Sequence, residues 1–130
     1  MDIFSNFNLD DALSHLVALA LAYGLALPIG WNREKEERSA GVRTFPLVAM
    51  AACSFVLIST SLPGATPDVQ SRILAGLMTG IGFVGGGAIL KQGDRATGTA
   101  TAASLWATGA IGAAVGYGEL DIAVILSLVI

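Results

Sequence analysis

Uncharged and mostly apolar residues fill four long stretches of the chain. They are Ala12–Asn32, Thr44–Pro67, Ile73–Leu90 and Ala96–Gly118, with 21, 24, 18 and 23 residues. A helix rises about 1.5 Å per residue, so roughly 20 apolar residues are needed to cross a hydrocarbon core about 30 Å thick. The pattern therefore predicts membrane-spanning helices and an integral membrane protein.

The last ten residues, Asp121–Ile130, form a shorter apolar segment. As a helix they would cover about 15 Å, which is half of the core. Either the chain is truncated within a fifth span or a short helix ends inside the membrane, and we favour truncation. The predicted fold class is all-α: a polytopic membrane helix bundle with five transmembrane helices, the fifth truncated. The expected spans are about 12–31, 45–62, 72–90, 98–117 and 121–130.

Turn-forming and capping residues mark the ends of the predicted helices. Thr44, which is followed by a proline in the first turn, is expected to cap the second span. Pro63 and Gly64 are expected to end that span, and Ser71 or Asp68 to cap the third.

The distribution of charge predicts the orientation of the spans. Only 13% of the residues are charged, and the mean hydropathy is +0.70. Six of the seven basic residues lie in the loops after the first and third spans, and Arg72 lies on the other side. Because short cytoplasmic loops carry an excess of Lys and Arg, the N-terminus is predicted to lie outside. The six residues are Arg33, Lys35, Arg38, Arg43, Lys91 and Arg95.

The third stretch, GLMTGIGFVGGGAIL (76–90), is unusually rich in glycine. Gly76 with Gly80, and Gly82 with Gly86, have the four-residue spacing that lets membrane helices approach closely. One interpretation is therefore a helix–helix seam, within the chain or between protomers. The other is that Gly85–Gly87 break the helix, so that free carbonyls line a cavity or bind a cation. We favour the seam, and both can hold at different ends of the segment.

Two polar groups are the other candidates for a site. Four hydroxyls, Thr97, Thr101, Ser104 and Thr108, recur at the spacing of one helical face in the fourth span. They either bond to neighbouring helices and to their own backbone or line a polar pathway, and we favour packing.

The second group lies in the loop after the first span. Asn32, Arg33 and Glu34, together with Arg43, are the one place where a charged site can assemble beside the spans. The same loop is equally well explained as a solvated turn that orients the protein.

The sequence predicts no enzyme and no catalytic residues. His15 is its single histidine and Cys53 its single cysteine, so neither a Ser-His-Asp triad inside the spans nor His/Cys metal-ligand spacing is present. The G-x-G-x-x-G match at Gly80–Gly85 lies inside an apolar span and follows no strand. A net charge of −3 argues against nucleic acid as a partner. No cofactor is expected, and the identity of any bound metal is unknown.

Three motifs resemble those of the MgtC/SapB family of membrane proteins. The segment GWNREKEERSAGVRTFPLV (30–48) resembles the family's first inner loop, in which G-x-x-R-E precedes A-G-[LV]-R-T. GIGFVGGGAIL (80–90) and ATGTATAASLWATGAIGAAVGYG (96–118) resemble two further family blocks. Two positions differ: Asn32 stands where many members have a carboxylate, and Phe45 where many have a histidine.

The resemblance implies a five-span domain in the bacterial inner membrane, often followed by a cytoplasmic regulatory domain, which is expected to be absent from this chain. It implies a role in Mg²⁺ homeostasis and growth at low Mg²⁺, and makes Mg²⁺ the candidate ion. For the best-studied branch it implies inhibition of the rotary ATP synthase. It also adds weight to Arg33, Glu34, Arg43, Thr44 and Gly80–Gly87 as functional residues.

Three hypotheses about function follow. The first is a regulator that binds another membrane complex or senses ionic conditions, since the first four spans contain no carboxylate. The second is a transporter or channel for a cation or small solute, using Gly85–Gly87, the hydroxyl row and the charged loop. The third is an anchor for a missing cytoplasmic domain. The expected partners are the lipid bilayer and a second copy, a homodimer formed through the glycine-rich faces.

Overall fold

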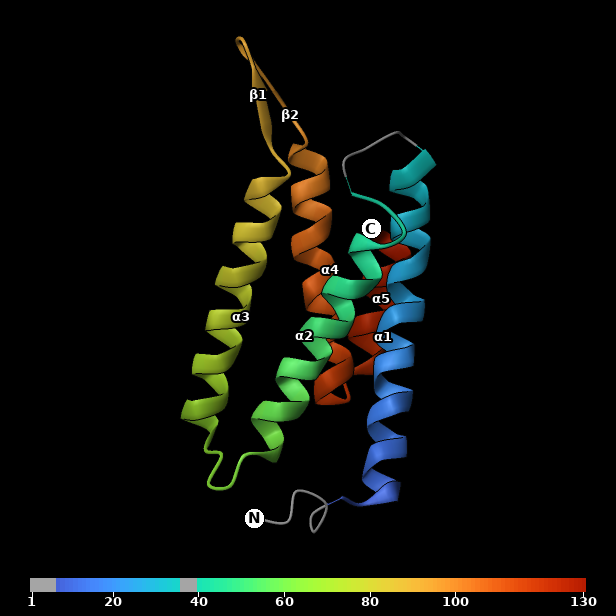
Figure 1. Cartoon of the computed structure of the whole chain (residues 1–130), viewed down its shortest axis with the longest axis vertical. Helices are drawn as coiled ribbons and strands as arrows, with labels where there is room; N and C mark the ends of the chain where they lie inside the picture. Colours follow the sequence, from blue (N-terminus) through green and yellow to red (C-terminus); the bar gives the residue numbers. More distant parts are fainter. Residues whose placement is uncertain (1–6, 36–39) are drawn as a thin grey trace.

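The computed structural model describes residues 7–35 and 40–130, and within them the chain is predominantly helical (Figure 1). Two short strands pair as an antiparallel hairpin between the third and fourth helices. The elements are α1 (Leu9–Lys35), α2 (Thr44–Ser61), α3 (Pro67–Gly87), β1 (Leu90–Gln92), β2 (Arg95–Thr97), α4 (Thr99–Tyr117) and α5 (Leu120–Val129).

The number of helices in this part of the chain is the number predicted, and their order is as expected. Two of them, α1 and α2, are long and apolar enough to cross a membrane. The arrangement of all five as membrane spans stays a prediction.

Helix α4 lies at the centre of the bundle and contacts each of the other four helices (Figure 1). Its glycines let it approach α2 closely, and its large side chains Leu105 and Ile111 are buried in the core. A Cβ placed on Gly112 would lie 2.9 Å from the Cα of Ala49 in α2, and one on Gly116 would lie 3.0 Å from the carbonyl oxygen of Cys53. At these two glycines the backbone of α4 therefore lies directly against α2.

Two of the predicted helix caps are wrong. Thr44 is the first residue of α2 and not its cap; Arg43 occupies the cap position, and its side chain makes no capping bond. Instead, the Gly41 carbonyl accepts hydrogen bonds from the backbone N–H groups of Thr44 and Phe45, at 3.0 and 3.2 Å. A backbone carbonyl in the preceding turn therefore accepts the hydrogen bonds that a capping side chain would otherwise accept.

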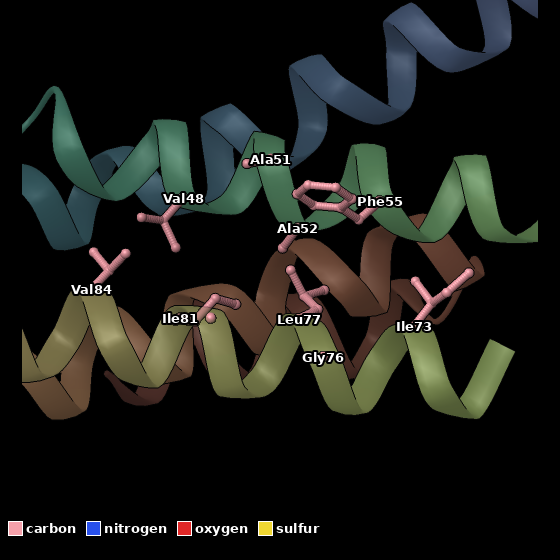
Figure 2. Close-up of a pocket in the computed structure, with 10 residues that line it drawn as sticks. Val48, Ala51, Ala52, Phe55, Ile73, Gly76, Leu77, Ile81 and Val84 are labelled. Atoms are coloured by element: carbon pink, nitrogen blue, oxygen red, sulfur yellow. The ribbon is translucent and has the colours of Figure 1, made fainter. Parts of the chain in front are cut away.

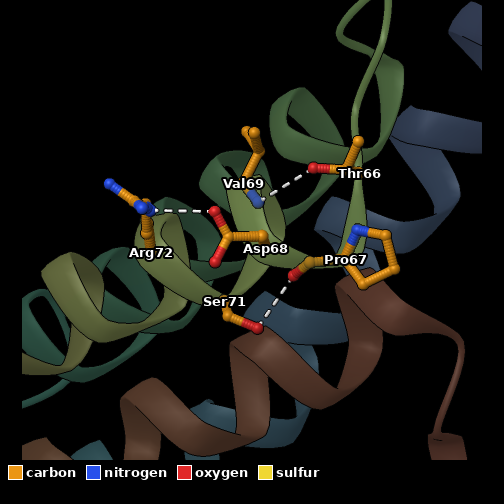
Figure 3. Close-up of polar contacts among 6 residues, drawn as sticks. All are labelled: Thr66, Pro67, Asp68, Val69, Ser71 and Arg72. Atoms are coloured by element: carbon orange, nitrogen blue, oxygen red, sulfur yellow. Dashed lines mark hydrogen bonds and ion pairs between the residues drawn. The ribbon is translucent and has the colours of Figure 1, made fainter.

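Helix α3 starts earlier than residue 72, and neither Ser71 nor Asp68 caps it. Thr66 is the cap, and its hydroxyl oxygen accepts a hydrogen bond from the N–H of Val69 at 3.4 Å (Figure 3). Pro67 follows at the first helical position, where its fixed φ favours the helix and its missing N–H costs nothing. Asp68 instead forms an exposed ion pair with Arg72 at 3.1 Å.

Thr97 does not belong to the helical row of hydroxyls predicted for the fourth span. It lies on β2, opposite Leu90, and is exposed. Gly98, at φ +89°, separates this strand from α4, and a Cβ there would meet the carbonyl of Ala88. Because the backbone at Gly98 is left-handed, the helix begins only after it, at Thr99. Thr97 therefore lies outside the helical row formed by Thr101, Ser104 and Thr108.

The predicted basic loops lie together at one end of the bundle, uppermost in Figure 1. Arg72 lies near the opposite end, in the early turns of α3, and Arg38 lies outside the described residues. We call the end of the bundle where these loops lie the basic end. Its described basic residues are Arg33, Lys35, Arg43, Lys91 and Arg95.

Helix α5 is held against α1 by a side chain. The Ser127 hydroxyl donates to the Leu25 carbonyl at 2.7 Å. Pro28, within α1, removes a backbone donor close to this carbonyl. The bond thus ties α5 to the region where the hydrogen bonding of α1 is interrupted.

Candidate functional site at the basic end

Arg33 connects two helices at the basic end of the bundle. It lies in the last turn of α1, is half-buried, and donates from Nη2 to the hydroxyl of Ser104 in α4 at 2.9 Å. A hydrogen bond to a charged group in a partly buried place contributes about 1.5–3 kcal/mol. The sequence placed these two residues in separate candidate groups, and the fold brings them together.

Glu34 folds the loop back toward α1. Its Oε2 accepts a hydrogen bond from the backbone N–H of Val42 at 2.9 Å. Gly41 and Gly30 allow this close approach: a Cβ on Gly41 would lie 3.1 Å from the Cβ of Glu34, and one on Gly30 would lie 3.0 Å from the carbonyl oxygen of Gly41. Gly41 and Val42 are thereby held at the end of α1 by the carboxylate of Glu34 and by the close approach that Gly30 allows.

The other residues of the predicted cluster lie around this pair of contacts. Asn32 and Arg43 are exposed, and Thr44 is half-buried at the start of α2. Phe45, the position that differs from the family pattern, is fully buried in the core. Arg33 and Glu34 therefore bond to different partners, Ser104 and Val42, around one end of the bundle.

Three of the four predicted hydroxyls, Thr101, Ser104 and Thr108, are buried on α4. Thr108 donates to the Ser104 carbonyl one turn earlier, at 2.7 Å, while the Ser104 hydroxyl accepts from Arg33. Such back-bonding satisfies a hydroxyl inside a helix without a second helix. The carbonyl oxygen and the hydroxyl oxygen of Ser104 thus each accept a side-chain hydrogen bond.

The glycines of α3 have unlike surroundings. The helix continues to Gly87, and the carbonyls of Gly85 and Gly86 accept from the N–H groups of Ala88 and Ile89 at 3.0 and 3.1 Å. These carbonyls are occupied by the C-terminal turn rather than free to line a cavity. Gly85 packs against α4, where a Cβ would lie 3.1 Å from the carbonyl oxygen of Ala102.

The remaining predicted glycines of α3 do not form a seam within the chain. A Cβ on any of them would meet no atom of the described residues within 4 Å. They are Gly76, Gly80, Gly82, Gly86 and Gly87.

An apolar groove of about 520 Å³ separates α2 from α3, and we call it the α2–α3 groove (Figure 2). The sequence reasoning missed it, because a groove depends on how far apart two helices stand. Its lining residues are Val48, Ala51, Ala52 and Phe55 of α2 and Ile73, Gly76, Leu77, Gly80, Ile81 and Val84 of α3.

Comparison with known proteins places this sequence in a family. A model of the MgtC family matches residues 19–130. The chain belongs to the MgtC family. Protein MgtC of Salmonella typhimurium (strain 14028s) is 37% identical over 116 residues, and Protein MgtC of Brucella abortus (strain 2308) is 39% identical over 119 residues. No solved structure matches the chain.

This MgtC-family chain spans about half the length of the curated relatives that it matches. The alignments cover 89% and 91% of the chain but 49% of each relative. Family membership and two helices long enough to cross a bilayer together support a membrane protein. The inner-loop motif that carried the resemblance contains the contact of Glu34 with Val42, and the contact of Arg33 joins this motif to Ser104 in the motif of residues 96–118.

Proposed function

We propose that the chain is a multi-pass protein of the bacterial inner membrane, with its N-terminus outside, that adapts the cell to low Mg²⁺ as a regulator binding membrane partners. Its membership of the MgtC family and its similarity to relatives called Protein MgtC support a role of the MgtC type. The ATP synthase is a candidate partner from the family resemblance.

The position of Arg33 is the observation that favours a regulator over a transporter. It meets the buried hydroxyl row of α4 at Ser104, the place where a polar pathway through the bundle would run. A fixed positive charge beside a pathway excludes cations. The row and its arginine therefore suit a structural junction better than a Mg²⁺ path.

Transport of a small solute is the second candidate, since Thr101, Ser104 and Thr108 do form a buried polar row. Deleting the gene from its bacterium and measuring growth at limiting and ample Mg²⁺ tests the proposed role. We expect a growth defect only at limiting Mg²⁺, restored by the wild-type chain. Purified protein in liposomes should show no Mg²⁺ flux, and a flux above that of empty liposomes would favour transport.

A homodimer formed through the outward glycines of α3 is part of this proposal. Gly82 and Gly86 meet open space, so a second helix can approach them closely. Gly82→Leu and Gly86→Leu are expected to lower the dimer fraction at least tenfold in light scattering of the detergent-purified protein. Gly24→Leu, at an equally open position of α1, is the control. Unchanged dimers in both α3 variants would count against the seam.

A further inference from the structure

We propose that the α2–α3 groove holds an acyl chain of an anionic phospholipid, whose phosphate lies at the basic end against Arg43, Lys91 and Arg95. The proposal rests on the membrane location proposed above. It assigns lipid binding to the groove, to the hairpin and to Arg43 of the predicted cluster.

The chemistry of the groove suits a hydrocarbon chain. Its lining consists of Gly, Ala, Val, Leu, Ile and Phe only, and its volume of about 520 Å³ lies within the roughly 300–1,000 Å³ of ligand pockets. An apolar space of this kind does not hold water well. An empty gap would forfeit the dispersion contacts of its walls, so a flexible chain is favoured to fill it.

The side chains that extend into the groove favour a lipid over a second copy of the chain. A helix with its side chains is about 10–12 Å across. Phe55, Leu77 and Ile81 extend into the space between α2 and α3 from both sides (Figure 2). An acyl chain is thinner than a helix and can bend around these side chains.

Charge determines which lipid fits. The groove extends to Val48, in the second turn of α2, and to Val84, in the last turn of α3, so it ends near the basic end. Arg43 occupies the cap of α2, whose first turn carries no acidic residue. Basic clusters at the ends of membrane helices bind anionic headgroups.

The hairpin adds two exposed basic residues, Lys91 and Arg95, beyond the end of α3. Within the described part of the chain, neither these nor Arg43 forms an ion pair, so their charges are available to a phosphate. The opposite end differs, because Arg72 there is paired with Asp68. Among the described residues, the basic end therefore carries three unpaired basic residues, Arg43, Lys91 and Arg95, against the one hairpin carboxylate, Asp94.

The test measures lipid retained by the detergent-purified chain, by native mass spectrometry, after addition of phosphatidylglycerol or phosphatidylcholine at equal concentration. We expect phosphatidylglycerol to be retained at least tenfold better. Gly80→Leu places a larger side chain at a groove-lining position where a Cβ meets open space, and is expected to reduce retention at least tenfold. Changing Arg43, Lys91 or Arg95 to Gln is expected to reduce it about fivefold each.

Two controls match these changes. Gly24→Leu adds the same side chain at an open position outside the groove, and Arg72→Gln removes a basic residue at the other end; both should retain lipid as the wild type does. A second measurement needs no variant. Phosphatidylglycerol with a photoreactive group on its acyl chain should label peptides of α2 and α3.

Equal retention of the two lipids, labelling confined to other helices, or a dimer lost in Gly80→Leu while lipid retention is unchanged would each overturn the proposal. In these cases the chain remains in membranes washed with alkaline carbonate, and the membrane location stands. Release of the chain by that wash would overturn the location, and the lipid proposal with it.

Discussion

Replacing Gly112 with alanine is expected to lower the free energy of unfolding by about 3 kcal/mol, the upper end of the usual range for an overpacked core. The new Cβ would lie 2.8 Å from the carbonyl carbon of Ala49 and closer still to its oxygen. These are backbone atoms of α2, so no side-chain rotation relieves the clash. The two helices must separate at the centre of the bundle.

Unfolding of the purified chain in mixed micelles of increasing denaturing detergent, followed by circular dichroism, measures this change. Gly24→Ala is the matched control, because its Cβ meets open space in α1. There alanine is expected to stabilise the helix by up to about 1 kcal/mol, as it does in an exposed helix interior. Equal effects of the two substitutions would contradict the tight contact between α2 and α4.

Replacing Arg33 with alanine is expected to abolish growth at limiting Mg²⁺ to the level of the deletion strain. The change removes the bond that joins α1 to Ser104 of α4 and removes the charge beside the hydroxyl row. Arg33→Lys keeps the charge but loses the planar guanidinium that reaches Ser104, so partial growth is expected. Ser104→Ala removes the hydrogen bond but keeps the charge of Arg33, so it shows which of the two the growth depends on.

The amount of each variant in the membrane must be measured, because the lost bond also costs stability of about 1.5–3 kcal/mol. Arg72→Ala, at the other end of the bundle, is expected to grow as the wild type does. Its ion pair with Asp68 is exposed, and such pairs contribute roughly 0–1 kcal/mol. Full growth of an Arg33→Ala strain with normal protein levels would contradict a functional site here. The loop after the first span would then serve only to orient the protein in the membrane.

The helices were predictable because each carries its signal locally. Runs of uncharged residues located α1 to α4, and Pro63 with Gly64, at φ +75°, ended α2 as expected. Caps were less predictable, because several nearby groups compete for the same N–H donors. At α3 the hydroxyl of Thr66 accepts from an N–H group of the first turn, and at α2 the backbone carbonyl of Gly41 does so.

The hydroxyl row and the charged loop were recognised as separate polar groups. Their connection, from Arg33 to Ser104, joins residues far apart in sequence, and no local pattern contains it. The loss of Thr97 from the row has a local cause, the left-handed backbone at Gly98, but glycine permits this conformation without requiring it.

By itself, the sequence determined the apolar helical class, the grouping of basic residues and the family resemblance, because hydropathy, charge and motifs are properties of short segments. Only the tertiary structure decided which glycines pack and which face open space. Gly85, Gly112 and Gly116 meet backbone or side chains of neighbouring helices, whereas Gly76 and Gly80 line a groove. The physical reason is that a missing Cβ permits close approach, but the distance between helices depends on every contact along them.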